Sequence, residues 1–295
     1  AAVFRTVFLG GLQPRRQILP LPIHTVQVGG VRHAVSGSDE ALGLCRIQPK
    51  GGAGSHGLVK SGEIVLKGAN KNFFENKLCA QLRHKSKLHG SFEVTRAQST
   101  VYIEPLDDSC DMDGMLADAC KVFGIVSVAR AAVCEKNMDS ICETIRAYLP
   151  DKLAGKKTFK VEAKRADKRF PLDSMEIASE CGAVVLESVP GIRVDVHNPE
   201  VTVRVEVRET NAFVHPGPVK AAGGMPVGSN GKAMLLLSGG IDSPVSTYMI
   251  AKRGVHLIPI HFFSFPYTSE AAKEKVIDLA QTLTAYCGKM RLCIV

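Results

Sequence analysis

Two serines, two glycines and an aspartate lie in the most chemically informative stretch of this 295-residue sequence. An apolar segment precedes the stretch and a helical pattern follows it, and its residues are Ser238, Gly239, Gly240, Ile241, Asp242 and Ser243. Glycines let a backbone approach a ligand closely, while hydroxyls and the free N–H groups of a helix start can donate to phosphate oxygens. The stretch therefore predicts a phosphate-binding loop between a strand and a helix.

Two other interpretations of this loop can be compared with that one. One is a plain strand-to-helix turn, in which Ser and Asp serve only as caps. A Walker loop is excluded, because Gly231-Lys232 is followed by Ala233 and Pro226 stands where the first glycine belongs. Asp242 would repel phosphate, so we expect it to hold Mg²⁺ or to orient the loop.

The elements that position the loop form the last of several modules. Residues 233–295 alternate strands with helices, which is typical of a doubly wound parallel sheet. The unalternating apolar run 233–237 predicts a strand buried on both faces. Residues 58–137 and 138–215 indicate two α+β modules, the first starting with a strand over 58–66, and 216–232 is a Gly- and Pro-rich connector. Residues 1–57 have no sustained period and are expected to be a poorly ordered leader.

Composition limits the class of protein. No apolar run approaches the roughly 20 residues that cross a bilayer. The nine cysteines are never spaced C-x-x-C, which favours a reducing, cytoplasmic compartment over a disulfide framework or a zinc ribbon. Lys and Arg exceed Asp and Glu by 37 to 29, and eight basic residues against three acidic ones lie within 151–170. Such a run is typical of a surface that binds nucleic acid or of a solvated face.

The loop resembles the pyrophosphate loop of the ATP pyrophosphatases, and its context is similar to one family among them. SGEIVLKG at 61–68, RADKRF at 165–170, HNPE at 197–200 and GGMPVG at 223–228 resemble motifs of the tRNA 4-thiouridine synthetases. The resemblance covers residues 58–295. It implies an α/β and α+β multidomain chain with a ferredoxin-like domain at 58–137, an RNA-binding THUMP domain at 138–215, a linker at 216–232, and a partial ATP pyrophosphatase (PP-loop) domain at 233–295.

The resemblance also implies an activity. Family members use ATP and Mg²⁺ to adenylate O4 of uridine 8 in tRNA, and sulfur from a persulfide then gives 4-thiouridine. They receive sulfur from a cysteine desulfurase and supply it to the thiazole of thiamine. A homodimer is expected from the same likeness. The family's persulfide cysteine is expected beyond residue 295, so no catalytic residue is assigned, and Cys287 and Cys293 are interpreted as packing residues.

Site residues are carried over from the family by motif. The ATP-binding set includes two residues at the end of the next strand, of which His261 could instead be a core or strand-end imidazole. The set is Leu237, Ser238, Gly239, Gly240, Ile241, Asp242, Ser243, His261 and Phe262. The predicted tRNA-binding set is Lys164, Arg165, Lys168, Arg169 and Phe170. Phe170 could stack on a base, but an aromatic beside Pro171 is also typical of a core. Lys252 and Arg253 either approach phosphate or complement a helix dipole.

Two other functions are compatible with the same residues. The chain could be a tRNA-binding module with an incomplete nucleotide site and no catalysis. It could also be an ATP pyrophosphatase that amidates a small molecule, although the THUMP-like motif and its basic strand argue against this.

Overall fold

The computed structural model describes residues 24–28, 54–97, 99–264 and 266–295. Most of the predicted leader therefore lies outside the described residues. Its described part differs from the expectation, because His24–Val28 form strand β1, which pairs antiparallel with the last strand of the chain. In the part of the chain that the structure describes, no helix is long and apolar enough to cross a membrane.

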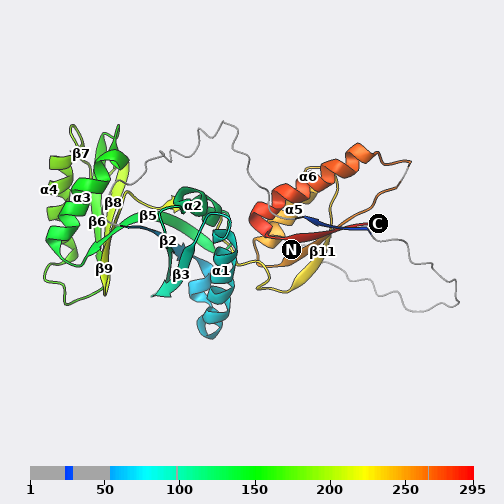
Figure 1. Cartoon of the computed structure of the whole chain (residues 1–295), viewed down its shortest axis with the longest axis horizontal. Coiled ribbons are helices and arrows are strands. Elements are labelled where there is room, and N and C mark those ends of the chain that lie inside the picture. The colour runs from blue at the N-terminus through cyan, green and yellow to red at the C-terminus, as the bar shows by residue number, and fades with distance from the viewer. Residues whose placement is uncertain (1–23, 29–53, 98, 265) are drawn as a thin grey trace.

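A nine-stranded sheet runs through both predicted α+β modules (Figure 1). Its strand order is β3-β4-β2-β5-β9-β8-β6-β7, with β10 on β5. The strands are β2 (Ser55–Ser61), β3 (Phe92–Ala97), β4 (Thr100–Pro105), β5 (Ile125–Glu135), β6 (Thr158–Arg165), β7 (Arg193–Val194), β8 (Val201–Val207), β9 (Asn211–His215) and β10 (Val219–Lys220). Strand β5 pairs with β2 of the first module and with β9 of the second, so the two modules share one sheet.

Four helices cover one face of this sheet. They are α1 (Lys71–Ser86), α2 (Met112–Cys120), α3 (Met138–Leu153) and α4 (Ser174–Ser188). Side chains alternate across a strand, and β5 contributes Val128 to the core under α1 and α2 and Cys134 to the core under α3 and α4. Both positions are even-numbered, so the two cores lie on the same face. The opposite face carries no helix among the described residues.

Local signals explain two of these helices. Phe74, Leu78 and Leu82 of α1 are buried at the expected spacing of four, which confirms that predicted helix. At the start of α4, Asp173 accepts from the N–H groups of Met175 and Glu176, and the Glu176 side chain accepts from Asp173 in return. The strand predicted over 58–66 is wrong in its second half, because 63–66 form the 3₁₀ turn η1 (Glu63–Leu66).

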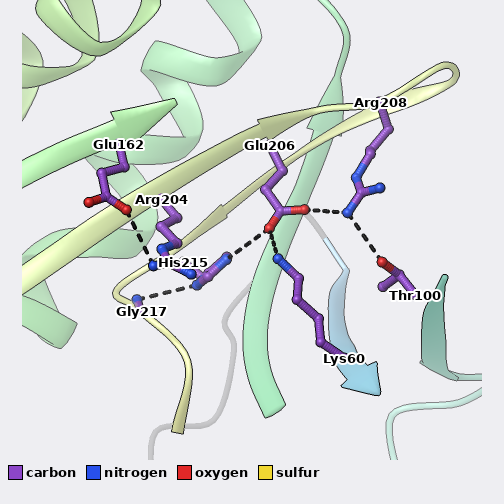
Figure 2. A network of polar contacts seen from close by, with 8 residues as sticks. All are labelled: Lys60, Thr100, Glu162, Arg204, Glu206, Arg208, His215 and Gly217. Carbon is purple, nitrogen blue, oxygen red and sulfur yellow. Dashed lines mark hydrogen bonds and ion pairs between the residues drawn. The ribbon is translucent and has the colours of Figure 1, made fainter. Parts of the chain in front are cut away.

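A buried carboxylate ties the two modules together on the helix-free face (Figure 2). Glu206 of β8 pairs with Lys60 of β2 and with Arg208, and the Arg208 guanidinium also donates to Thr100 of β4. Nδ1 of His215 accepts from the N–H of Gly217, so the proton of the ring lies on the other nitrogen, Nε2. Nε2 lies 3.9 Å from the Glu206 carboxylate. Burial raises the pKa of Glu206, but His215, Lys60 and Arg208 outweigh it and hold that pKa well below its usual range.

The last unit is a second, four-stranded sheet. Its order is β1-β13-β12-β11, and β11 (Lys232–Leu236), β12 (His256–His261) and β13 (Met290–Ile294) run parallel. Helices α5 (Asp242–Ala251) and α6 (Glu270–Cys287) contact each other and β12. The expectation that 233–237 is buried on both faces is wrong: β11 is an edge strand, and Met234 and Leu236 are 68% and 63% exposed on the side away from the helices.

The predicted linker is an ordered connector. The N–H of Gly124 donates to Gly223 O at 2.8 Å, and the N–H of Met225 donates to Lys252 O at 2.9 Å. Segment 221–225 is therefore hydrogen-bonded both to the nine-stranded sheet's module and to the last unit. Gly224 has φ +79°, and a Cβ there would lie 2.3 Å from Lys252 O. Only glycine fits this contact. Phe123 completes the junction by packing against Tyr248 and Tyr286 at ring distances of 5.1 and 6.1 Å.

The buried carboxylate gives a stability prediction. Glu206→Gln should lower the free energy of unfolding by about 3 kcal/mol at neutral pH, because Lys60 and Arg208 lose their buried counter-charge. The folded pKa of Glu206 is lowered, so its contribution is present above the ordinary carboxyl pKa and is lost as the pH falls. Urea unfolding should therefore show a smaller difference in unfolding free energy between Glu206→Gln and the unchanged chain at pH 4 than at pH 7.

The matched control is Glu162→Gln on the same face, whose carboxylate is 43% exposed and pairs with Lys160 and Arg204. It should cost less than about 1 kcal/mol. Equal losses in the two variants would contradict a structural role for the buried network.

Candidate nucleotide and RNA sites

The predicted phosphate loop lies at the carboxyl end of β11 and is closed by its two serines. Oγ of Ser243 accepts from the N–H of Ser238 at 3.0 Å and donates to Ser238 O at 3.1 Å. Thr247 then anchors Ser243 by donating to its carbonyl at 2.7 Å. These bonds hold Gly239 and Gly240 in an open turn in front of α5.

Helix α5 begins without a side-chain cap. The residue at its N-cap position is Ile241, which is 83% exposed and has no polar group to satisfy the first N–H groups of the helix. Asp242 is also exposed. This start differs from a plain capped turn, because its unsatisfied donors and positive dipole end suit an anion.

His261 brings the end of β12 to the loop. Its Nδ1 lies 3.0 Å from Leu237 O, and since a carbonyl only accepts, Nδ1 carries the proton. The ring is 8% exposed, and its Nε2 is buried without a hydrogen-bond partner among the described residues. That nitrogen is therefore an unused acceptor. The neighbouring Phe262 is 61% exposed at the same edge.

One further cation lies at the loop. The Cδ of Lys275 on α6 is 3.6 Å from the position that a Cβ on Gly239 would occupy. Lys273, two residues earlier, instead pairs with Glu270 and lies over the Phe263 ring. Sequence reasoning missed Lys275, because its neighbour in space lies 36 residues away across a strand and a helix. The only sequence feature that could have indicated Lys275 is its position in the first turns of α6, the helix that packs on β12.

The predicted tRNA-binding residues have different environments. Lys164 and Lys168 are exposed at the end of β6. Arg165 donates to the carbonyls of Phe170 and Leu172 at 3.0 and 3.1 Å, so it shapes the loop. The structure corrects the stacking role of Phe170, which is 4% exposed and belongs to the core between the sheet and α4.

Arg169 also has a partner within the protein. It makes two hydrogen bonds of 3.1 Å to Asp167, which also accepts from Lys136 at 2.9 Å. These hydrogen bonds from Arg169 and Lys136 hold the pKa of Asp167 well below its usual range. The Arg169 side chain is nevertheless 82% exposed, so its outer face remains accessible. The basic loop, which we define as residues 166–173 between β6 and α4, and the phosphate loop lie at opposite ends of the molecule (Figure 1).

The remaining candidates behave as structural residues. The thiol of Cys287, the last residue of α6, is buried, and burial raises its pKa to about 12. It is therefore protonated at neutral pH and not nucleophilic. The carbonyl of Lys252 accepts from the N–H of Met225 and so ties the end of α5 to the connector, while its ammonium lies 5.9 Å from the centroid of the Tyr248 ring.

Comparison with known proteins covers the three units separately. Family models match residues 56–129 (ThiI ferredoxin-like domain), 135–215 (THUMP domain) and 228–295 (Thiamine biosynthesis protein, ThiI). The ferredoxin-like, THUMP and partial PP-loop architecture expected from the sequence is confirmed in this order.

Curated relatives carry one name. The chain is 48% identical over 238 residues to the probable tRNA sulfurtransferase of Alkaliphilus oremlandii, covering 80% of this chain and 60% of that protein. It is 48% identical over 240 residues to that of Acetivibrio thermocellus, covering 81% and 61%. The chain thus spans about three fifths of the length of these relatives.

Two solved structures share the fold. A 4-thiouridine synthetase in complex with RNA and ATP superposes with a TM-score of 0.73 at 35% identity, covering 82% of this chain and 62% of that one. PH1313 from Pyrococcus horikoshii superposes with a TM-score of 0.68 at 24% identity, over 79% and 75%, and supports the fold alone. With these domains in this order, and with relatives of one name along four fifths of its length, the chain belongs to the tRNA sulfurtransferase family of 4-thiouridine synthetases.

Proposed function

We propose that this chain binds tRNA and ATP and adenylates O4 of uridine 8, the first half of 4-thiouridine formation. The observation that carries the proposal is the uncapped start of α5 behind Gly239 and Gly240, with the unused Nε2 of His261 at the same edge of the sheet. The relatives named tRNA sulfurtransferase and the solved complex with RNA and ATP support it.

Each polar group in the loop has a role in the proposed nucleotide complex. The N–H groups at the start of α5 donate to phosphate oxygens, and Lys275 adds positive charge beside Gly239. Nε2 of His261 accepts from the amino group of adenine. Asp242 would hold Mg²⁺ together with the phosphates, and the ion would neutralise charge on the leaving pyrophosphate.

The chemistry follows from this placement. O4 of the uridine attacks the α-phosphorus, a new O–P bond forms, the bond to pyrophosphate breaks, and the proton on N3 passes to solvent. A carbonyl oxygen becomes a good leaving group once AMP is attached to it, so a sulfur nucleophile can then displace AMP at C4. We assign that sulfur to the outer atom of a persulfide charged by a cysteine desulfurase, and a second thiol then cleaves the S–S bond, which releases 4-thiouridine and leaves a disulfide. Cys287 is not the carrier, because its raised pKa keeps it a thiol.

The proposal also has a cellular setting. A tRNA substrate assigns the reaction to the cytoplasm. The description of the matched family model supports sulfur supply to thiamine biosynthesis as a second branch. A homodimer stays a prediction of the family likeness.

One prediction of the proposed function concerns ATP. Lys275→Ala should weaken ATP binding about tenfold, because a charge-assisted hydrogen bond is worth about 1.5 kcal/mol. Lys273→Ala is the matched control on the same helix and should bind ATP as the unchanged chain does, since Lys273 is paired with Glu270. Equilibrium dialysis with Mg-ATP measures both. If the two variants behave alike, Lys275 does not serve the nucleotide.

Another prediction of the proposed function concerns tRNA. Replacing Lys164 and Lys168 together by Gln should lower the slope of log affinity against log salt by about 1.8, because each phosphate that is no longer neutralised lowers it by about 0.9. The free energy of unfolding should not change, because both side chains are exposed. Filter binding of tRNA over a salt series measures the slope, and an unchanged slope would refute a role for these lysines at the RNA backbone.

Arg165→Gln is the contrasting variant. It leaves the carbonyls of Phe170 and Leu172 without their donor, so it should lower the free energy of unfolding by about 1 to 2 kcal/mol.

A further inference from the structure

A basic groove lies between α1 of the first module and the nucleotide-binding unit. Its volume is about 390 Å³, and its walls come from α1, the connector, the start of β12 and the end of α6. Among the described residues that line it there is no carboxylate, and its cationic or imidazole side chains are Lys77, His84, Lys85, His256 and Lys289. Such a lining selects an anion.

The groove is held in shape by bonds across the junction. Gln81 of α1 donates to Val227 O at 3.0 Å, and Lys85 donates to Ala285 O at 3.0 Å near the end of α6. Lys85 also lies 3.9 Å from Asp118, so its charge is partly compensated. These contacts fix the two walls relative to each other and leave the other cations to a ligand.

Two lysines are available to that ligand. Nζ of Lys77 is 3.8 Å from the position of a Cβ on Gly228, and Cβ of His256 is 4.0 Å from the same point, so both side chains converge on the connector. Lys289 is exposed on the opposite wall. Within the described part of the chain, neither Lys77 nor Lys289 has a carboxylate partner, and Nζ of Lys77 lies 5.8 Å from the centroid of the Phe73 ring. Lysines without a counter-charge that face one cavity suit the oxygens of a phosphate group.

The groove is separate from the phosphate loop. His256 and Lys289 lie at the amino ends of β12 and β13, whereas the loop and His261 lie at the carboxyl ends. The five residue steps from His256 to His261 separate the two edges of the sheet by about 17 Å at ~3.3 Å per step. One small anion cannot contact both, but a polynucleotide, with a charge every ~3.4 Å along each strand, can.

We propose that this groove binds a backbone phosphate of the RNA substrate, with Lys77 and Lys289 as its main donors. The inference rests on the proposed tRNA function and deepens it. It gives the RNA a contact at the junction of α1 with the last unit, away from the β6 end that carries Lys164 and Lys168. A free anion such as pyrophosphate is the other source of the same chemistry, and the experiment separates the two.

The test replaces Lys77 and Lys289 together by Gln in the full chain. If each lysine neutralises one phosphate, the salt slope of tRNA binding falls by about 1.8, and the affinity at 0.15 M salt falls roughly thirtyfold. ATP binding should be unchanged. The control removes a charge from α3 outside the basic run 151–170, Arg146→Gln, and should leave the slope within about 0.5 of the unchanged chain.

The outcomes separate this site from the proposed function. A slope and affinity equal to those of the unchanged chain, or an equal fall in the α3 control, would overturn the groove as an RNA site. Loss of pyrophosphate binding with tRNA binding intact would overturn it in favour of a free anion. If the unchanged chain binds no tRNA at all, the proposed function fails first, and the groove fails with it.

Discussion

The pairing of β5 with β9 is the constraint on which the rest of the structure depends. It joins the ferredoxin-like and THUMP modules into one sheet, and the contact of Glu206 with Lys60 fixes the same boundary through side chains. Because a buried carboxylate without its cations is costly, the two modules cannot separate without exposing it. The basic loop after β6 is therefore held at a fixed place relative to α1.

The connector extends this rigidity to the PP-loop unit. Its bonds to Gly124 on one side and Lys252 on the other, with Phe123 packed against Tyr248, leave little room for rotation between the sheets. The phosphate loop, the basic loop after β6 and the basic groove are then held at fixed positions relative to one another. An RNA that contacts the THUMP end and the groove would be aligned by the protein before any chemistry starts.

Much of this could be predicted from the sequence, because the signals are local. The phosphate loop depends on glycines and hydroxyls within six residues, and α1 and α4 on apolar spacing and a capping box. The exposure of Met234 and Leu236 could not be predicted, since an apolar run does not say which of its faces a helix covers. The partner of Arg165 was hidden for a similar reason, because a basic motif looks the same whether its guanidinium faces RNA or a carbonyl. Lys77 and Lys289 come from distant parts of the chain, so only the fold brings them together.

The most direct test of the proposed adenylation is the identity of the products that this chain makes from ATP in the presence of unmodified tRNA. Adenylation of the uridine predicts tRNA-dependent release of pyrophosphate, with AMP appearing as water or sulfur resolves the adenylate. Chromatography of labelled nucleotides distinguishes this from cleavage at the γ-phosphate. Release of ADP and phosphate, pyrophosphate release that does not depend on tRNA, or no cleavage with tRNA bound would contradict adenylation by this chain.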